Sequence, residues 1–344
     1  MVVANVPAPA PSYVAILKAK QGELLAAQTT PPDNFIPLFE VIEPSKSAAI
    51  ARGWPHGDHV VWVQPINFAG MDDQGWADAV TDLFEDLRRS GTAAVPVITL
   101  DETVATRSAV RAILGMDARG LVLRLDCEEV LDATPASLQS AVGNVLADCG
   151  ALANDTDVVL DAGLVSGGVA VQSGAAGAAL AAIPYLSQWR NLSTAFSGFP
   201  ELISDHVSPS SVGSIPRLDA AAFNHLASRF TQRSLVFADY GVGVPTYADA
   251  KWSPIPNIKY AVAGEWIIHR AATKLNPSPQ YIQLAHDLVS APYFSGAGYS
   301  PGDDYISAVA TGGDGPGNAG SYLKAAMSRH FHVVLDSLAT RGAP

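Results

Sequence analysis

The sequence predicts a (β/α)8 barrel of the TIM type, and three observations support this fold class. Eight short apolar runs follow one another along the chain, and segments with the spacing of amphipathic helices lie between them. The runs are almost continuously apolar, as is typical of strands buried on both faces of a parallel sheet. The alternative, an open doubly wound sheet, is less well supported, because LKAKQGE follows the first run where that fold has a Gly-x-Gly-x-x-Gly phosphate motif.

Each predicted strand is an apolar run of five to eight residues. In chain order the strands are 13–18, 35–42, 59–66, 94–100, 120–126, 157–161, 191–197 and 234–240. Apolar residues at three- and four-residue spacing predict the helices between them. In 75–90, for example, Trp76, Val80 and Leu83 share one face. Similar helices are expected at 103–116, 134–152 and 218–230, with a weaker, Ala-rich candidate at 171–183.

The chain does not pass straight from the eighth strand into a helix. Residues 257–270 predict a hairpin of two short strands around Ala263 and Gly264, followed by a helix at 279–290, a Gly/Pro loop at 295–304 and a closing helix at 321–338. We therefore expect one barrel domain over residues 1–344, with residues 241–320 inserted in the last βα connection and covering the C-terminal face. Barrels carry their function on long loops at this face.

Composition limits the class of function. The chain has 21 Lys and Arg against 33 Asp and Glu, a formal net charge of −12, which excludes a general nucleic-acid coat. Two cysteines, Cys127 and Cys149, do not make a disulfide framework. The N-terminus lacks a signal-peptide pattern, and the most apolar stretch, 174–186, is too short to cross a bilayer. We expect a soluble cytoplasmic protein without membrane association.

Polar residues at the C-terminal ends of the predicted strands form the candidate site, because these ends meet at one rim of a barrel. Four carboxylates are the candidate catalytic residues: Glu40, Asp126, Asp161 and Asp239. Lys18, Lys20 and Arg124 are the candidate ligands for an anion, and the third strand adds Gln64. Since buried charges are costly unless paired, these side chains predict a polar cavity. The alternative is that they are hydrated strand-end residues.

The carboxylates suit general acid–base catalysis, a glycosidase pair or a Mg²⁺ site, and the choice of cofactor stays open. We assign no metal ligands. The sequence contains no His-Glu-x-x-His motif, and His330 and His332 point to different faces of their predicted helix. His330 remains a ligand-binding candidate that would reach the cavity from the last helix.

Two glycine-containing loops, 298–304 (GYSPGDD) and 312–318 (GGDGPGN), lie in the last connection. Glycine lets backbone N–H groups converge on an anion, and barrels often bind phosphate in this connection. Asp303 is a candidate in the first loop, although acids oppose a phosphate, and Lys259 and Arg270 would supply positive charge. Ordinary turns are the alternative for both loops.

Aromatic residues also gather in the C-terminal third of the chain. They include Tyr240, Tyr260 and Trp266. Such rings either stack on a base or sugar or cover the barrel mouth.

Several blocks resemble one known family. They are FADYG at 237–241, NIKYAVAGEWIIHR at 257–270, PYFSGAGYSPGDDYI at 292–306, GPGN at 315–318 and RHFHVV at 329–334, with YVAILKAKQGEL and IPLFEVIEP near the N-terminus. In this order they resemble the Beta protein family of tailed phages and bacterial genomes. Residues 261–264 and 321–322 depart from its pattern. The resemblance implies a phage-derived or defence-associated protein and brings no reaction.

Two functions are left open. The first is an enzyme, a hydrolase or lyase that acts on a small phosphorylated or nucleotide-like anion in a polar cavity at the C-terminal face. The second is a non-catalytic binding, host-interaction or immunity protein that uses the barrel as a scaffold for a protein partner.

Overall fold

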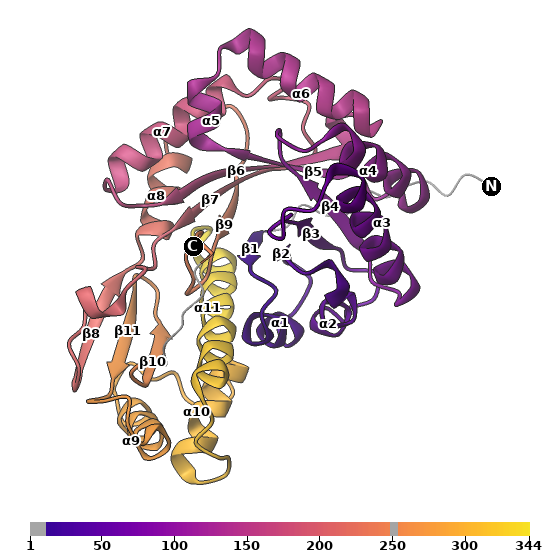
Figure 1. The fold of residues 1–344 in the computed structure, drawn as a ribbon. Helices are drawn as coiled ribbons and strands as arrows, with labels where there is room; N and C mark the ends of the chain where they lie inside the picture. The colour runs from indigo at the N-terminus through magenta and orange to yellow at the C-terminus, as the bar shows by residue number, and fades with distance from the viewer. Residues whose placement is uncertain (1–11, 248–253) are drawn as a thin grey trace.

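Eight parallel strands close into a barrel in the computed structural model, which describes residues 12–247 and 254–344 (Figure 1). Around the barrel they are β1 (Tyr13–Leu17), β2 (Phe35–Val41), β3 (Val61–Pro65), β4 (Ala94–Ile98), β5 (Leu121–Asp126), β6 (Thr156–Leu164), β7 (Leu192–Ser197) and β9 (Val236–Asp239). β1 pairs with both β2 and β9, which closes the cylinder. All eight predicted strands are confirmed, and the open-sheet alternative is wrong.

Helices follow the strands and surround the barrel. They are α1 (Gln21–Gln28), α2 (Ser47–Gly53), α3 (Asp73–Arg89), α4 (Val104–Asp117), α5 (Cys127–Asp132), α6 (Pro135–Cys149), α7 (Val169–Ala182) and α8 (Leu218–Ala227). Short 3-10 turns lie at Pro44–Lys46, Ala153–Asp155 and Ile203–Asp205. α3 shows the local cause: Asp72 caps it by accepting a hydrogen bond from the Gly75 N–H, and Trp76 and Val80 are buried on one face. α1, α2 and α5 were not predicted, because each is too short to show a clear helical period.

A second, antiparallel sheet packs beside the barrel, in the strand order β10-β11-β8 (Figure 1). β10 (Asn257–Ala261) and β11 (Glu265–Arg270) form the predicted hairpin, in which Asn257 pairs with Arg270. β8 (Ser211–Pro216) was not predicted, and it comes from the connection between β7 and β9. The sheet therefore draws on two βα connections, while the predicted insertion covers only the second.

Three helices complete the chain: α9 (Pro277–Val289), α10 (Pro301–Thr311) and α11 (Ala319–Arg341). The loop predicted at 295–304 is partly wrong, because its last residues form the first turn of α10, where the Ser300 hydroxyl accepts a hydrogen bond from the Asp303 N–H. α11 runs between the second sheet and the barrel, in contact with α1, α10 and β10 (Figure 1). Residues 1–11 and 248–253 of the predicted domain lie outside the described residues.

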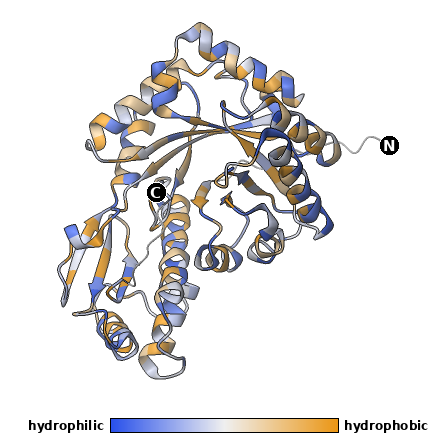
Figure 2. Ribbon diagram, viewed as in Figure 1, coloured by the Kyte–Doolittle hydropathy of each residue, from blue (hydrophilic) through white to orange (hydrophobic). Residues whose placement is uncertain are grey.

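Hydrophobic residues lie along the strands of the barrel and on the inner sides of the helices (Figure 2). One buried cluster fills the space between strands and helices, another the interior of the barrel, and a third the contact of α9, α10 and α11 with β10. In the described part of the chain, no helix combines the length and the apolar character needed to cross a lipid bilayer.

Candidate functional site

Side chains inside the barrel form layers, because alternate residues of each strand point inward. Apolar residues such as Ile16, Trp62 and Val159 fill the middle of the barrel. Two residues further along, at the C-terminal ends, the inward rows end in polar side chains. This polar layer consists of Lys18, Glu40, Gln64, Arg124, Asp161 and Tyr240. The structure therefore brings together five predicted candidates and Gln64 at one mouth of the barrel.

Arg124 lies at the centre of the polar layer, and each of its five N–H donors has an acceptor. Nη1 donates to Glu40 Oε1 at 2.7 Å and to Gln64 Oε1 at 2.5 Å. Nη2 donates to Asp161 Oδ2 and to the Tyr240 hydroxyl, both at 2.6 Å. Nε donates to Asp161 Oδ2 at 3.2 Å, and Tyr240 donates its hydroxyl proton to the same oxygen. One guanidinium thus holds a carboxylate from β2 and another from β6.

The two oxygens of Glu40 have different surroundings. Oε1 is held by Arg124, whereas Oε2 is buried and has no hydrogen-bond partner among the described residues. The Tyr247 hydroxyl is the neighbouring donor: burial, the charge of Glu40 and a hydrogen bond to that carboxylate raise the pKa of Tyr247, although the contact falls short of normal hydrogen-bond geometry. A buried carboxylate oxygen without a partner is costly, and it is poised to accept a proton or a hydrogen bond.

Two lysines reach the same mouth, one from the end of β1 and one from the second sheet. Lys18 donates to the Thr246 carbonyl, and its Nζ lies 4.7 Å from the centre of the Tyr247 ring. Lys259 extends from β10, donates to the Val242 carbonyl at 3.2 Å and lies 4.4 Å from the centre of the Phe199 ring. Burial lowers the pKa of Lys18, and it lowers the pKa of Lys259 to about 8. Each ammonium keeps N–H donors beyond the one bond described, so both suit an anionic group.

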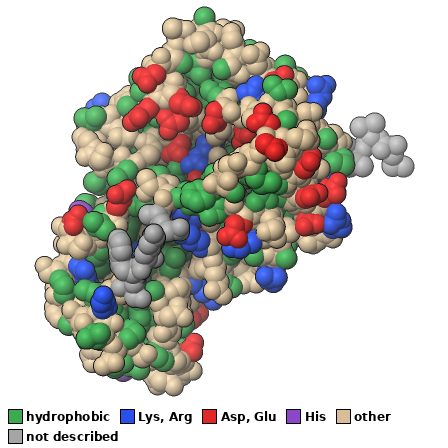
Figure 3. Space-filling model, viewed as in Figure 1, with side chains coloured by type: hydrophobic (Ala, Val, Ile, Leu, Met, Phe, Trp, Pro, Cys, Tyr) green, Lys and Arg blue, Asp and Glu red, His purple; other side chains and the backbone are tan. Residues whose placement is uncertain are grey.

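Acidic side chains gather over α5, next to a hollow in which basic and acidic side chains lie together (Figure 3). Asp126 belongs to this region but not to the polar layer. It is exposed and caps α5, because its Oδ1 accepts hydrogen bonds from the N–H groups of Glu128 and Glu129 at 2.8 and 3.1 Å. The carboxylates that do lie together, Glu40 and Asp161, already share the Arg124 guanidinium. They do not fit a Mg²⁺ site, since a cation occupies the space between them.

Asp239, His330 and Trp266 lie outside the barrel, in a network buried between β9, α11 and β11. Trp266 Nε1 donates to His330 Nδ1 at 3.2 Å, and His330 Nε2 lies 2.7 Å from Asp239 Oδ2. Because an indole N–H can only donate, Nδ1 must be the acceptor and the proton of the imidazole lies on Nε2. Tyr13 donates to Asp239 Oδ1 at 2.6 Å. The predicted site residues Asp239, His330 and Trp266 therefore join α11 and the second sheet to the barrel. They do not line its mouth.

The same network contains a group of metal-type ligands, Asp219, Asp239 and His330, whose ligand atoms lie within 4.8 Å of one another. Arg217, fully buried, already fills this group. Its Nη2 donates to Asp219 Oδ2 at 2.6 Å and lies 3.7 Å from Asp239 Oδ2. A guanidinium between the two carboxylates supplies the positive charge that a metal ion would bring, so the group does not fit a metal site.

Tyr260 and Asp303 belong to a third cluster, centred on Arg329. Tyr260 donates to Asp303 Oδ1 at 2.8 Å, and Arg329 Nη1 donates to Asp303 Oδ2 at 3.0 Å. The guanidinium also lies 4.3 and 4.2 Å from the centres of the Tyr260 and Tyr299 rings. This cluster ties β10 and the first turn of α10 to α11, away from the polar layer. Arg270 donates to the Val207 carbonyl at the second sheet.

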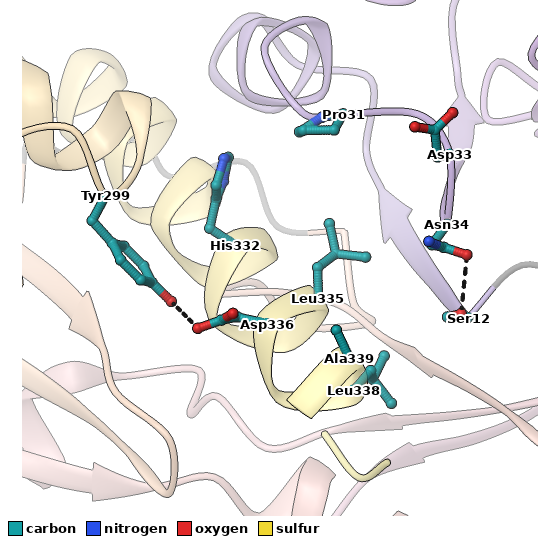
Figure 4. Close-up of a pocket in the computed structure, with 10 residues that line it drawn as sticks. All are labelled: Ser12, Pro31, Asp33, Asn34, Tyr299, His332, Leu335, Asp336, Leu338 and Ala339. Atoms are coloured by element: carbon teal, nitrogen blue, oxygen red, sulfur yellow. Dashed lines mark hydrogen bonds between the residues drawn. The ribbon is translucent and has the colours of Figure 1, made fainter. Parts of the chain in front are cut away.

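A cavity of about 430 Å³ opens at the other end of the barrel (Figure 4). Ser12 and Asn34, which precede β1 and β2, line one side of it, and the last turns of α11 line the other. On the α11 side of the cavity, Tyr299 donates to Asp336 Oδ2 at 3.2 Å, and His332 also lines this side (Figure 4). The N-terminal ends of barrel strands serve stability more often than chemistry, and none of the predicted candidates lies here.

Sequence reasoning missed Arg217, Arg329 and Tyr247. Arg217 follows β8, which the sequence did not reveal as a strand, so its position carried no signal. Arg329 precedes His330 by one residue, and on a helix adjacent residues point in directions about 100° apart. Asp303 was expected in a loop, so the sequence carried no signal of its burial or of its need for a cation such as Arg329.

Comparison with known proteins identifies one family. The sequence model described as Beta protein matches residues 13–336, nearly the whole chain. No curated protein and no solved structure matches the chain.

Proposed function

The chain belongs to the Beta protein family, and we propose that it is an enzyme, a hydrolase or lyase, that acts on a small phosphorylated or nucleotide-like ligand at the C-terminal mouth of its barrel. Active sites of TIM-like barrels lie at this end, on loops that follow the strands. Arg124 and two carboxylates are concentrated there, at the inner rim, while the interior below them is apolar.

The observation that carries the proposal is the asymmetry of Glu40. Arg124 keeps Oε1 in place, while Oε2 is buried, makes no hydrogen bond of normal geometry among the described residues and has the Tyr247 hydroxyl beside it. A carboxylate fixed in this way can accept a proton from an attacking water in a hydrolase, or from a carbon acid in a lyase. Asp161 and Tyr240 would orient Arg124, and no step needs a metal ion.

Lys18 and Lys259 supply the binding half of the proposed site. Both ammonium groups reach the mouth, and both are partly withdrawn from water, so a phosphate or carboxylate would be attracted more strongly than at the surface. Phe199 and Tyr247, against which the two ammonium groups lie, offer ring faces for the remainder of such a ligand.

Native mass spectrometry of the gently purified chain tests the proposal. We expect a bound anion of low mass on the wild type, and its loss from Lys18→Ala and Lys259→Ala. Lys274→Ala, which removes an exposed lysine from the second-sheet side, should keep the ligand. Glu40→Gln should bind the ligand and fail to convert it. Equal occupancy in the Lys18, Lys259 and Lys274 variants would contradict a site at the barrel mouth.

A second function has one observation in its favour. All five N–H donors of Arg124 are used inside the polar layer, so the layer is largely neutralised by its own members. Such a layer would stabilise the barrel without binding a ligand. This favours a non-catalytic binding, host-interaction or immunity protein that uses the barrel as a scaffold. In that case Glu40→Gln would change stability alone, and the wild type would carry no small ligand.

A further inference from the structure

A cavity of about 360 Å³ lies where the first turns of three helices meet. Its lining includes Gln21 and Gly22 of α1, Pro301 and Gly302 of α10, and Gly320 and Ser321 of α11. Each helix start carries the positive end of a helix dipole, about half an elementary charge. Three such ends around one space favour an oxyanion there.

The first turn of α1 lacks a side-chain cap among the described residues. α10 and α11 have caps of their own, because Ser300 and Asn318 accept hydrogen bonds from their first turns. At the same position α1 has Lys20, whose ammonium group can donate hydrogen bonds but cannot accept them. The first N–H groups of α1 therefore need an acceptor that the described side chains do not provide.

Ser328 is an independent observation that points to a ligand. It lines the cavity on the same face of α11 as Ser321 and Lys324, at the spacing of successive helical turns. Its side chain is completely buried, and its Oγ has no hydrogen-bond partner among the described residues. A buried hydroxyl without a partner is costly, so a ligand oxygen at this point would relieve a real deficit.

The charged side chains that line the cavity are Lys324 and Asp314. Asp314 is engaged in its own loop, where Oδ1 accepts a hydrogen bond from the Gly315 N–H at 2.7 Å. Lys324 has no such engagement among the described residues, and Lys20 lies next to the lining residue Gln21. The first turns of α1 and α10 also carry Glu23, Asp303 and Asp304, and each of these carboxylates is engaged nearby, by the Lys20 N–H, Arg329 and the Gly298 N–H respectively. Lys20 and Lys324 are cations without a carboxylate partner among the described residues.

We propose that this cavity binds a phosphate group, either as the free ion or as a phosphate monoester. Lys324 and the first turn of α1 would hold the phosphate oxygens, and Ser328 would donate its hydroxyl proton to one of them. The site uses no residue of the polar layer in the barrel, so this proposal can be tested independently of the proposed enzymatic function.

Isothermal titration and thermal unfolding of the full chain with inorganic phosphate test this site, against chloride at equal ionic strength. We expect phosphate to raise the Tm of the wild type. Lys324→Ala and Ser328→Ala should each weaken phosphate binding about tenfold, as for loss of one hydrogen bond to a charged group. In chloride, Ser328→Ala should be at least as stable as the wild type, because it removes the unpartnered hydroxyl.

Lys274→Ala is the control and should keep the wild-type affinity for phosphate, while Lys18→Ala reports any phosphate that binds at the barrel mouth. An equal rise of Tm in all variants would show only the general stabilising effect of phosphate salts, and would overturn the proposal. A loss of binding in Lys18→Ala but not in Lys324→Ala would also overturn it, because the phosphate would then bind at the barrel mouth.

Discussion

Glu40 on β2 and Arg124 on β5 meet inside the barrel, where the Arg124 Nη1 donates to Glu40 Oε1 at 2.7 Å. Both side chains are nearly buried, with exposed fractions of 4% and 11%. Asp161 is held by the same guanidinium at 2.6 Å. The three side chains are therefore coupled, and the loss of the one cation leaves two carboxylates in a poorly solvated space.

Arg124→Leu should consequently lower the free energy of unfolding by about 3–5 kcal/mol at pH 7, the usual effect of removing one partner of a buried ion pair. Part of this loss should be recovered at pH 4, where the stranded carboxylates take up protons. Urea unfolding at both pH values measures the effect. Arg89→Ala, which removes an exposed arginine paired within α3, is the control and should change little. A similar small change in Arg124→Leu would contradict the coupling.

The buried network around Asp239 predicts a stability that depends on pH. Burial raises the pKa of Asp239, but the electrostatic interaction and hydrogen bond with His330, then the charge of Arg217 and the hydrogen bond from Tyr13, outweigh burial, so the net shift is downward. A carboxyl with a lowered pKa in the folded state stabilises the protein above its unfolded pKa, about 3.9, and this contribution is lost as the pH falls further. Asp239→Asn should therefore cost about 3 kcal/mol at pH 7 and clearly less at pH 3.

Urea unfolding of wild type and Asp239→Asn between pH 3 and pH 7 checks this. Asp33→Asn is the control, since the Asp33 side chain is 84% exposed and should have little effect at any pH. A difference between wild type and Asp239→Asn that stays constant down to pH 3 would mean that the carboxylate charge does not stabilise this network.

The strands and part of the site were predictable because they depend on short stretches of sequence. A strand buried on both faces needs an unbroken apolar run, and the first polar residue after it falls at the rim, as Glu40 and Asp161 do. Whether that residue points into the barrel or out of it depends on packing with distant parts of the chain. Asp239 and Tyr240 are neighbours at the end of β9, and the structure turns Tyr240 into the barrel and Asp239 out of it. Either of the two neighbours could take the inward position, and the surrounding sequence FADYG does not indicate which one does.

Contacts that depend on the second sheet were beyond prediction for another reason. Lys259 reaches the mouth only because β10 is held against α11, and β8, which completes that sheet, comes from a different connection. Asp126 shows the opposite case, in which a strand-end acid serves the next helix as its cap. The spacing of polar residues along the sequence predicts which strand-end side chains lie at the rim of the barrel. The side chains that reach the rim from other elements, such as Lys259, depend on how the inserted strands and helices pack.

Lys259 should lose its proton far below the usual range of lysine. Burial lowers its pKa from 10.5 to about 8. Between these two values the unfolded chain binds more protons than the folded one, so stability should rise with pH in that window, and it should do so less in Lys259→Met. NMR titration of the ¹³C-methylated protein measures the midpoint, and Lys259→Met identifies the resonance. A midpoint near 10.5 would show that this ammonium group is well hydrated and would weaken its assignment to the site.

Gly302 is required by the contact between α10 and α11. A Cβ at this position would lie 2.2 Å from the Ala325 carbonyl oxygen, on the backbone of α11, which cannot move without shifting the helix. Gly302→Ala should therefore lower the free energy of unfolding by about 2 kcal/mol or more, and it should also disturb the cavity at the start of both helices. Gly115→Ala in α4 is the matched control, because a Cβ there meets nothing within 4 Å. That variant should gain up to about 1 kcal/mol from reduced chain entropy. Urea unfolding of the two variants should thus give changes of opposite sign. If both variants were stabilised, α10 and α11 would not be in the close contact that the structure shows.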